Sequence, residues 1–178
     1  LTLAACLGGL FYYVLSRPSE LDAIYRQGLA HYEAGEFGQA AGAFTRCLEL
    51  RAKWPQAHFG RAQSLRRQEQ WPAARTDYIA LAEVEPAWAH ALAGYCSMRA
   101  NDEQTAASDF DVAHKQHLRD PSFLINYANV QRRRARYADA VTLYSEVLAN
   151  HPTHKVALHE RPLILLATVI NDRRRLPD

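Results

Sequence analysis

Residues 121–152 read PSFLINYANVQRRRARYADAVTLYSEVLANHP, and this stretch decides the fold. In it, Ala128 is followed by Ala140 twelve positions later and by Tyr144 four positions after that. The i, i+4 spacing puts Ala140 and Tyr144 on one face of a helix. Pro152 cannot continue that helix, because proline lacks the backbone N–H. We therefore predict two helices, which we call helix A and helix B, joined by a short turn.

The same three marks recur three times earlier in the chain. Successive small residues lie 34, 32 and 34 positions apart, and each is followed by an alanine and an aromatic residue at the intervals given above. Periods of this length indicate stacked structural repeats. The small residues are Gly28, Ala62, Gly94 and Ala128, the alanines are Ala40, Ala74, Ala106 and Ala140, and the aromatic residues are Phe44, Tyr78, Phe110 and Tyr144.

The marks have a simple physical interpretation. The small residue lets helix A approach helix B of the same repeat, and the aromatic residue fills the gap beside it. Proline just past helix B ends that helix, and Pro121 after Asp120 can also open the next helix A. The prolines near the repeat junctions are Pro55, Pro86, Pro121 and Pro152.

This pattern resembles the tetratricopeptide repeat family over about residues 21–152. The resemblance implies an all-α fold, a right-handed superhelical solenoid of antiparallel helix pairs. Further matches are the aromatic residues that open helix B, namely Phe37, Trp71 and Tyr137. Departures are Glu103 in place of the third such aromatic residue, and Ile24, His58, His90 and Leu124 in place of the early tryptophan of the family.

Four full repeats are followed by the beginning of a fifth. Ala167 fits the small position of that fifth repeat, and Pro162 is expected at the start of its helix A. Without a helix B to cover them, Leu163, Leu165, Leu166 and Val169 should be partly exposed. The predicted boundaries are 1–17 for an apolar N-terminal segment, 21–54, 55–86, 87–120 and 121–152 for the four repeats, and 160–178 for the truncated fifth.

Residues 1–16 carry no charged side chain and are followed by Arg17. They fall just short of the roughly 20 residues that span a bilayer. Their tyrosine pair and Arg17 are typical of a membrane interface. Four interpretations stay open: the end of a spanning helix, a secretory signal core, a lipobox over Leu3–Cys6 with a lipidated Cys6, and a cap helix on the first repeat. We expect a membrane-associated protein, single-pass or lipid-anchored, on an undetermined side.

Composition and motifs argue against several functional classes. The net charge of only +2, with acidic residues interspersed among the basic ones, does not favour nucleic-acid binding. The three cysteines are far apart and indicate neither a disulfide framework nor a zinc site. His114 and His117 share a helix face but have no further ligand fixed nearby. We find no catalytic motif and expect no enzyme activity, cofactor or metal.

The family resemblance implies that helix A lines a concave groove. Residues about one helical turn from the small position should then face the ligand. Arg67, Arg99 and Arg133 recur at equivalent positions and should form a ladder along one edge of the groove. The predicted peptide-binding residues are Phe59, Gln63, Arg66, Arg67, Tyr95, Met98, Arg99, Asn129, Arg132 and Arg133.

Such a groove suits an extended peptide with acidic residues or a free C-terminal carboxylate, because arginine grips a carboxylate with two hydrogen bonds. The sequence thus predicts a non-catalytic, membrane-tethered scaffold that binds a protein or peptide. Two alternatives stay open: the sensory or docking region of a larger bacterial membrane-bound serine/threonine kinase, and an assembly lipoprotein of the cell envelope. Arginines at helix ends also have an ordinary explanation in the helix dipole and solubility.

Overall fold

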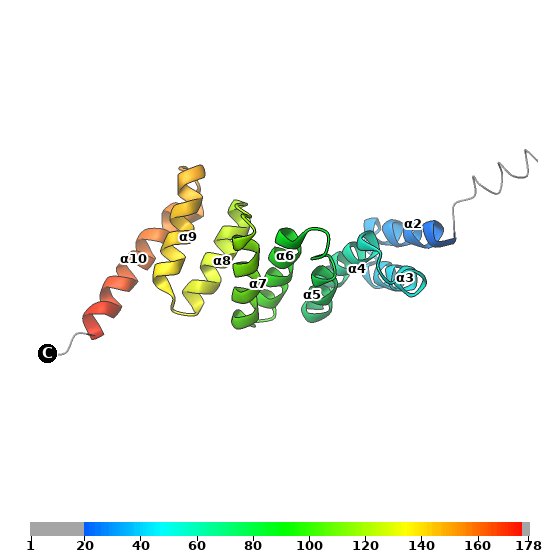
Figure 1. Cartoon of the computed structure of the whole chain (residues 1–178), viewed down its shortest axis with the longest axis horizontal. Helices are drawn as coiled ribbons and strands as arrows, with labels where there is room; N and C mark the ends of the chain where they lie inside the picture. Colours follow the sequence, from blue (N-terminus) through cyan, green and yellow to red (C-terminus); the bar gives the residue numbers. More distant parts are fainter. Residues whose placement is uncertain (1–19, 176–178) are drawn as a thin grey trace, which may run out of the picture. The chain divides into compact units, whose positions relative to one another are not determined.

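The structure is a computed structural model that describes residues 20–175, with side chains described for residues 20–169. Every regular element in the described range is an α-helix (Figure 1). The helices are α2 (Glu20–Glu33), α3 (Phe37–Leu50), α4 (Pro55–Arg67), α5 (Trp71–Ile79), α6 (Pro86–Arg99), α7 (Glu103–Lys115), α8 (Pro121–Arg133), α9 (Tyr137–Asn150) and α10 (Lys155–Arg175).

Helix starts follow local sequence signals. Proline occupies the first turn of α4, α6 and α8, where its missing N–H costs nothing. The Asp102 carboxylate caps α7 by accepting from the Thr105 backbone N–H at 3.0 Å. The Asp120 carboxylate caps α8 by accepting from the Phe123 N–H at 2.9 Å. Each cap satisfies a backbone donor that the helix leaves unpaired.

The turns between helix A and helix B share one backbone conformation. In each of the four turns a residue with positive φ follows helix A, and these residues repeat at the 34, 32 and 34 spacing of the sequence marks. A left-handed residue at this place ends a helix and satisfies its last carbonyl groups. The residues are Gly35 (φ 79°), Glu69 (φ 59°), Asn101 (φ 60°) and Ala135 (φ 57°).

The chain divides into two compact units, with the boundary between residues 69 and 70. In unit 1, helices α2, α3 and α4 pack around Phe44, which is fully buried. A Cβ atom added to Gly28 would lie 2.9 Å from the Phe44 ring, and one added to Gly60 would lie 2.6 Å from it. The ring is therefore held between two glycine backbones, one on α2 and one on α4.

Unit 2 repeats this packing with more layers. Phe110 of α7 lies against Gly94 of α6, where an added Cβ would lie 2.6 Å from the ring. Phe123 and Tyr127 of α8 contact the same ring, with centroid distances of 5.7 and 5.8 Å. The close approach of helix A and helix B at the small residue is thus confirmed for Gly94. The same core continues through α9 to Ile164 of α10.

An ion pair between the partly exposed Arg75 and the buried Asp109 joins two repeats inside unit 2. Asp109 is 5% exposed as a residue, and its carboxylate accepts two hydrogen bonds from the Arg75 guanidinium, at 2.9 and 3.1 Å. His90 lies beside it, with Nδ1 3.4 Å from the carboxylate. Removing Arg75 would leave the buried Asp109 carboxylate without its main partner, so the pair helps to fix how α5 and α7 are placed within this unit.

Helix α10 differs from the sequence prediction. It begins at Lys155, seven residues before Pro162, which lies inside the helix and not at its start. Its start is marked instead by His154, whose Nδ1 accepts from the Ala157 N–H at 3.4 Å. Leu163, Leu165, Leu166 and Val169 are exposed by 41–60%, as predicted, while Ile164 is buried against the core.

The membrane prediction rests on residues 1–17, which lie outside the described residues. Among residues 20–175, none of the helices combines the length and the apolar character needed to cross a membrane.

Gly60→Ala should destabilise unit 1 by about 1–3 kcal/mol, because the added methyl group collides with the buried Phe44 ring. Gly42→Ala is the matched control, since it is also a helical glycine of unit 1 but has no atom within 4 Å of its Cβ position. That control should stabilise the helix by about 0.5–1 kcal/mol. Urea denaturation followed by circular dichroism measures both. Equal effects of the two substitutions would show that the ring contact is not tight.

Ala135→Gly should raise the free energy of unfolding by about 0.5–1 kcal/mol, because glycine adopts positive φ without the clash that an L residue suffers. Gly35→Ala is the reverse experiment at the equivalent turn. No atom lies within 4 Å of its Cβ position, so the substitution adds no clash. The protein should lose stability, because the strain of alanine at positive φ outweighs the lower entropy of the unfolded chain. If both substitutions shift the thermal midpoint in the same direction, backbone strain does not control these turns.

Candidate functional site

An apolar hollow of about 330 Å³ opens on the helix A face of unit 1. We call it the unit 1 hollow. Helix α2 contributes side chains spaced four and three positions apart, which lie on one face of the helix. Helix α4 contributes the facing wall, and the Phe44 ring of α3 contributes the floor. The lining residues are Tyr25, Leu29, Tyr32, Phe44, Gln56, Phe59, Gly60 and Gln63.

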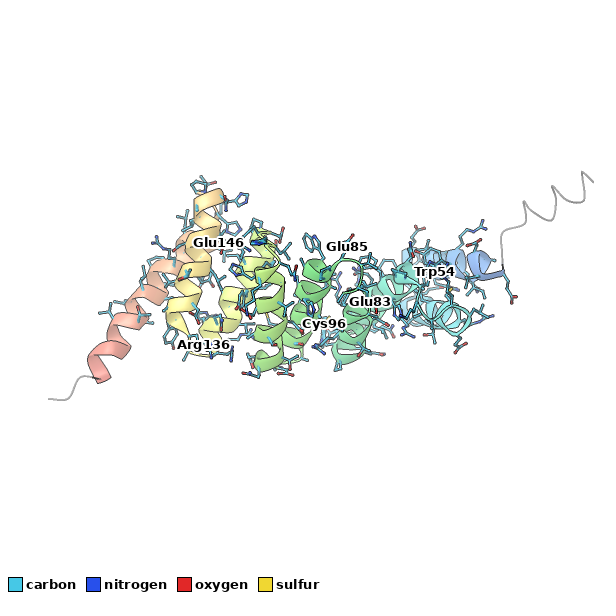
Figure 2. All side chains as sticks on the ribbon, in the orientation of Figure 1. Trp54, Glu83, Glu85, Cys96, Arg136 and Glu146 are labelled. Atoms are coloured by element: carbon cyan, nitrogen blue, oxygen red, sulfur yellow. The ribbon has the colours of Figure 1, made fainter. Side chains whose placement is uncertain are left out.

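Two apolar side chains of the unit 1 hollow reach solvent. Leu29 is 38% exposed and Phe59 is 44% exposed. Tyr25 is held in place behind them, because its ring packs on Phe44 at 5.6 Å and on Trp54 at 4.8 Å. Trp54 immediately precedes α4 (Figure 2). The hollow therefore has a fixed aromatic wall and an exposed apolar rim, an arrangement that can bury a side chain of a ligand.

Burial raises the pKa of the Tyr25 phenol, and the nearby Cys47 thiol raises it further. The hydroxyl thus stays protonated and neutral at physiological pH. The Tyr25 phenol therefore carries no negative charge that would repel an acidic ligand.

The predicted groove residues of unit 1 are Phe59, Gln63, Arg66 and Arg67, and the structure brings the first two together in the unit 1 hollow. Arg66 and Arg67 end the same helix, one turn further along. The Nε atom of Arg66 is buried and makes no hydrogen bond within the described residues. Arg67 lies over the ring of Phe37, with its guanidinium carbon 4.5 Å from the ring centroid.

The arginines of the predicted ladder share a contact that the sequence interpretation missed. Each lies at the end of helix A and touches the first residue of helix B in the preceding repeat. Arg67 stacks on Phe37, and Arg99 stacks on Trp71 with a carbon-to-centroid distance of 4.6 Å. In the third repeat Glu103 replaces the aromatic residue that opens helix B. Arg133 forms an ion pair with it, with Nη1 3.5 Å from Oε1.

A signal for this pairing was present in the sequence. The arginines and the residues that open helix B keep a nearly constant separation of 28–30 positions. The three arginine side chains nonetheless remain exposed. A guanidinium has about five N–H donors. The ring contacts of Arg67 and Arg99 and the ion pair of Arg133 do not use all of them, so each side chain can still donate to a ligand.

The other predicted residues of unit 2 have mixed surroundings. Tyr95 accepts a hydrogen bond from Arg99 Nη1 at 3.1 Å, and Met98 packs partly buried against the core. The Asn129 side-chain oxygen accepts from the Tyr144 hydroxyl at 2.9 Å, so it serves a core residue. Arg132 is exposed at the end of α8. That these residues act with those of unit 1 as one groove stays a prediction.

The cysteine side chains and that of His114 pack or form contacts within the fold. Cys47 and Cys96 are both buried. His114 Nε2 contacts the Glu146 carboxylate at 2.9 Å and so links α7 to α9. Among residues 20–169 no group of three or more histidine, cysteine, aspartate or glutamate side chains is placed to hold a metal ion.

Comparison with known proteins identifies the repeats. A family model described as tetratricopeptide repeat matches residues 25–91 and 59–117, and a second model with the same description matches residues 124–154. None of the curated proteins matches the chain.

Several solved structures share the fold. A crystal structure of MamA superposes with a TM-score of 0.77 at 13% identity, covering 86% of this chain and 85% of that chain. YrrB, described as a TPR protein with an unusual peptide-binding site, gives 0.72 at 14% identity, covering 84% and 79%. A tetratricopeptide repeat protein from Parabacteroides merdae gives 0.69 at 16% identity, covering 94% and 66%.

The predicted fold class, an all-α solenoid of helix pairs, is confirmed by these structures and by the helices of residues 20–175. The first family model alone spans residues 25–117, which is more than half of the chain. The chain therefore belongs to the tetratricopeptide repeat family.

Proposed function

We propose that this protein is a non-catalytic interaction module that binds a segment of a partner protein on the helix A face of its repeats. The unit 1 hollow carries the proposal, because it combines about 330 Å³ of space with two exposed apolar side chains and a fixed aromatic wall. Apolar side chains left in water beside a hollow gain free energy when a ligand covers them, by about 25 cal/mol per Å².

The ligand should combine an apolar anchor with an acidic group. Arg66 and Arg67 follow Gln63 by three and four positions on α4, which puts them one turn along from the hollow. A carboxylate placed one turn, about 5 Å, from the anchored side chain would therefore meet the guanidinium groups. The likeness to YrrB, whose description includes a peptide-binding site, supports a peptide as the ligand.

Attachment to a membrane is the second part of the proposal. It is based on the uncharged sequence of residues 1–16 and on Arg17 after it. In this arrangement the repeats hold a partner near the membrane surface. Attachment and ligand binding depend on different parts of the chain, so the failure of one would leave the other standing.

Peptides selected on the full chain from a random displayed library should contain an apolar residue followed by an acidic one. Leu29→Glu should weaken their binding at least tenfold, about 1.4 kcal/mol, because it places a carboxylate at the rim of the unit 1 hollow. Phe59→Ala should weaken binding by removing apolar contact area. Fluorescence anisotropy with a labelled peptide measures both effects.

Leu50→Ala is the matched control, because Leu50 is 61% exposed at the end of α3 and does not line the hollow. Charge reversal at Arg67 or Arg133 is a poorer test, since those side chains also contact Phe37 and Glu103 within the chain. Selected peptides that bind Leu29→Glu as tightly as they bind the unmodified chain would contradict the proposed site.

A further inference from the structure

A second hollow, of about 280 Å³, lies within unit 2 between α7 and α8. We call it the polar hollow. It is formed by helix B of the third repeat and helix A of the fourth, and none of the predicted groove residues lines it. Helix α7 contributes positions spaced as i, i+3, i+4 and i+7, which form one face. The lining residues are Gln104, Ala107, Ser108, Asp111, Tyr127, Gln131, Arg134 and Arg136.

A hydrogen-bonded network fixes one wall of the polar hollow. Gln131 is 5% exposed and donates from Nε2 to the Tyr127 hydroxyl at 3.3 Å. Arg134 donates from Nη1 to the Gln131 side-chain oxygen at 3.3 Å and from Nη2 to that of Gln104 at 2.7 Å. These acceptors are neutral amides. The guanidinium is therefore held in position without a carboxylate to neutralise its charge.

A second guanidinium lines the same hollow. Arg136 stands at the turn between α8 and α9 (Figure 2), directly after the positive-φ residue Ala135. Its guanidinium makes no hydrogen bond or ion pair with any of residues 20–169. The one carboxylate in the lining, that of Asp111, is paired with Lys115 at 2.6 Å and not with either arginine. The hollow thus presents two positive groups whose charge is not offset by a partner.

Two hydroxyl groups add donors to the polar hollow. Burial raises the pKa of the Tyr127 phenol, and the Asp111 charge raises it further, so that the phenol keeps its proton. Because its oxygen already accepts from Gln131, its own O–H is available to donate. Ser108 supplies a second hydroxyl from the exposed face of α7. The lining is consequently rich in donors and positive in charge.

We propose that the polar hollow binds a phosphate monoester, carried by a phosphorylated serine or threonine side chain of a partner protein. Such a group has about −1.5 to −2 charge at neutral pH and three terminal oxygens. Those oxygens can accept from both guanidinium groups and a hydroxyl at once, whereas a carboxylate has only two oxygens and matches one guanidinium. This site is independent of the unit 1 hollow and does not rest on the function proposed for it.

The test is titration of the full chain with O-phosphoserine, inorganic phosphate and acetate at constant ionic strength, observed through the arginine Nε–Hε signals in NMR spectra. O-phosphoserine should shift the Arg134 and Arg136 signals, with acetate at least tenfold weaker. Arg136→Gln should weaken O-phosphoserine binding at least fivefold, and Ser108→Glu should abolish it by filling the hollow with negative charge. Both residues are exposed, so both variants should fold.

Arg161→Gln is the matched control, because it removes the same charge from an exposed position of α10 in the same unit, and it should leave binding unchanged. A loss equal to that of Arg136→Gln would overturn the proposal, since binding would then follow net charge alone. Binding of inorganic phosphate without O-phosphoserine, or of acetate as tightly as O-phosphoserine, would also overturn it. Leu29→Glu should not change this titration, which separates the two sites.

Discussion

The contact between an aromatic ring of helix B and the bare backbone of helix A is the constraint on which the rest of this structure depends. Phe44 meets Gly28 and Gly60 at distances that leave no room for a methyl group, and Phe110 meets Gly94 in the same way. Close-packed interiors transmit such contacts, because they have no free volume in which to absorb a misplaced atom. The ring thus sets the spacing of the helices, and the spacing determines the size of the unit 1 hollow.

Sequence reasoning predicted the all-α fold and the buried small and aromatic residues because these depend on a few atoms at fixed intervals. The predicted start of the last helix was wrong. Pro162 was expected at the helix start, where proline is common, but the link after α9 is short and α10 already begins at Lys155. Gly60 was also missed as a contact of Phe44, since it lies outside the repeated marks. The contact of Gly60 with Phe44 joins two different helices, and local spacing carries no information about it.

The candidate sites were less predictable than the fold. Phe59 and Gln63 line the same hollow, as expected of two residues four positions apart on one helix face. The contacts of Arg99 with Trp71 and of Arg133 with Glu103 were not foreseen, since these partners belong to the preceding repeat. The polar hollow was not predicted from the sequence. Its side chains come from α7 of the third repeat and from α8 and the turn after it in the fourth, and the family resemblance implies no binding role for them.

The stacking of Arg67 on Phe37 and of Arg99 on Trp71 has an entropic consequence. A free arginine side chain loses up to about 2 kcal/mol of rotamer freedom when it is immobilised. An arginine already held over a ring has given up much of that freedom during folding. An anion that approaches its outer edge therefore meets a preorganised donor, so less of its binding energy is spent on ordering the side chain.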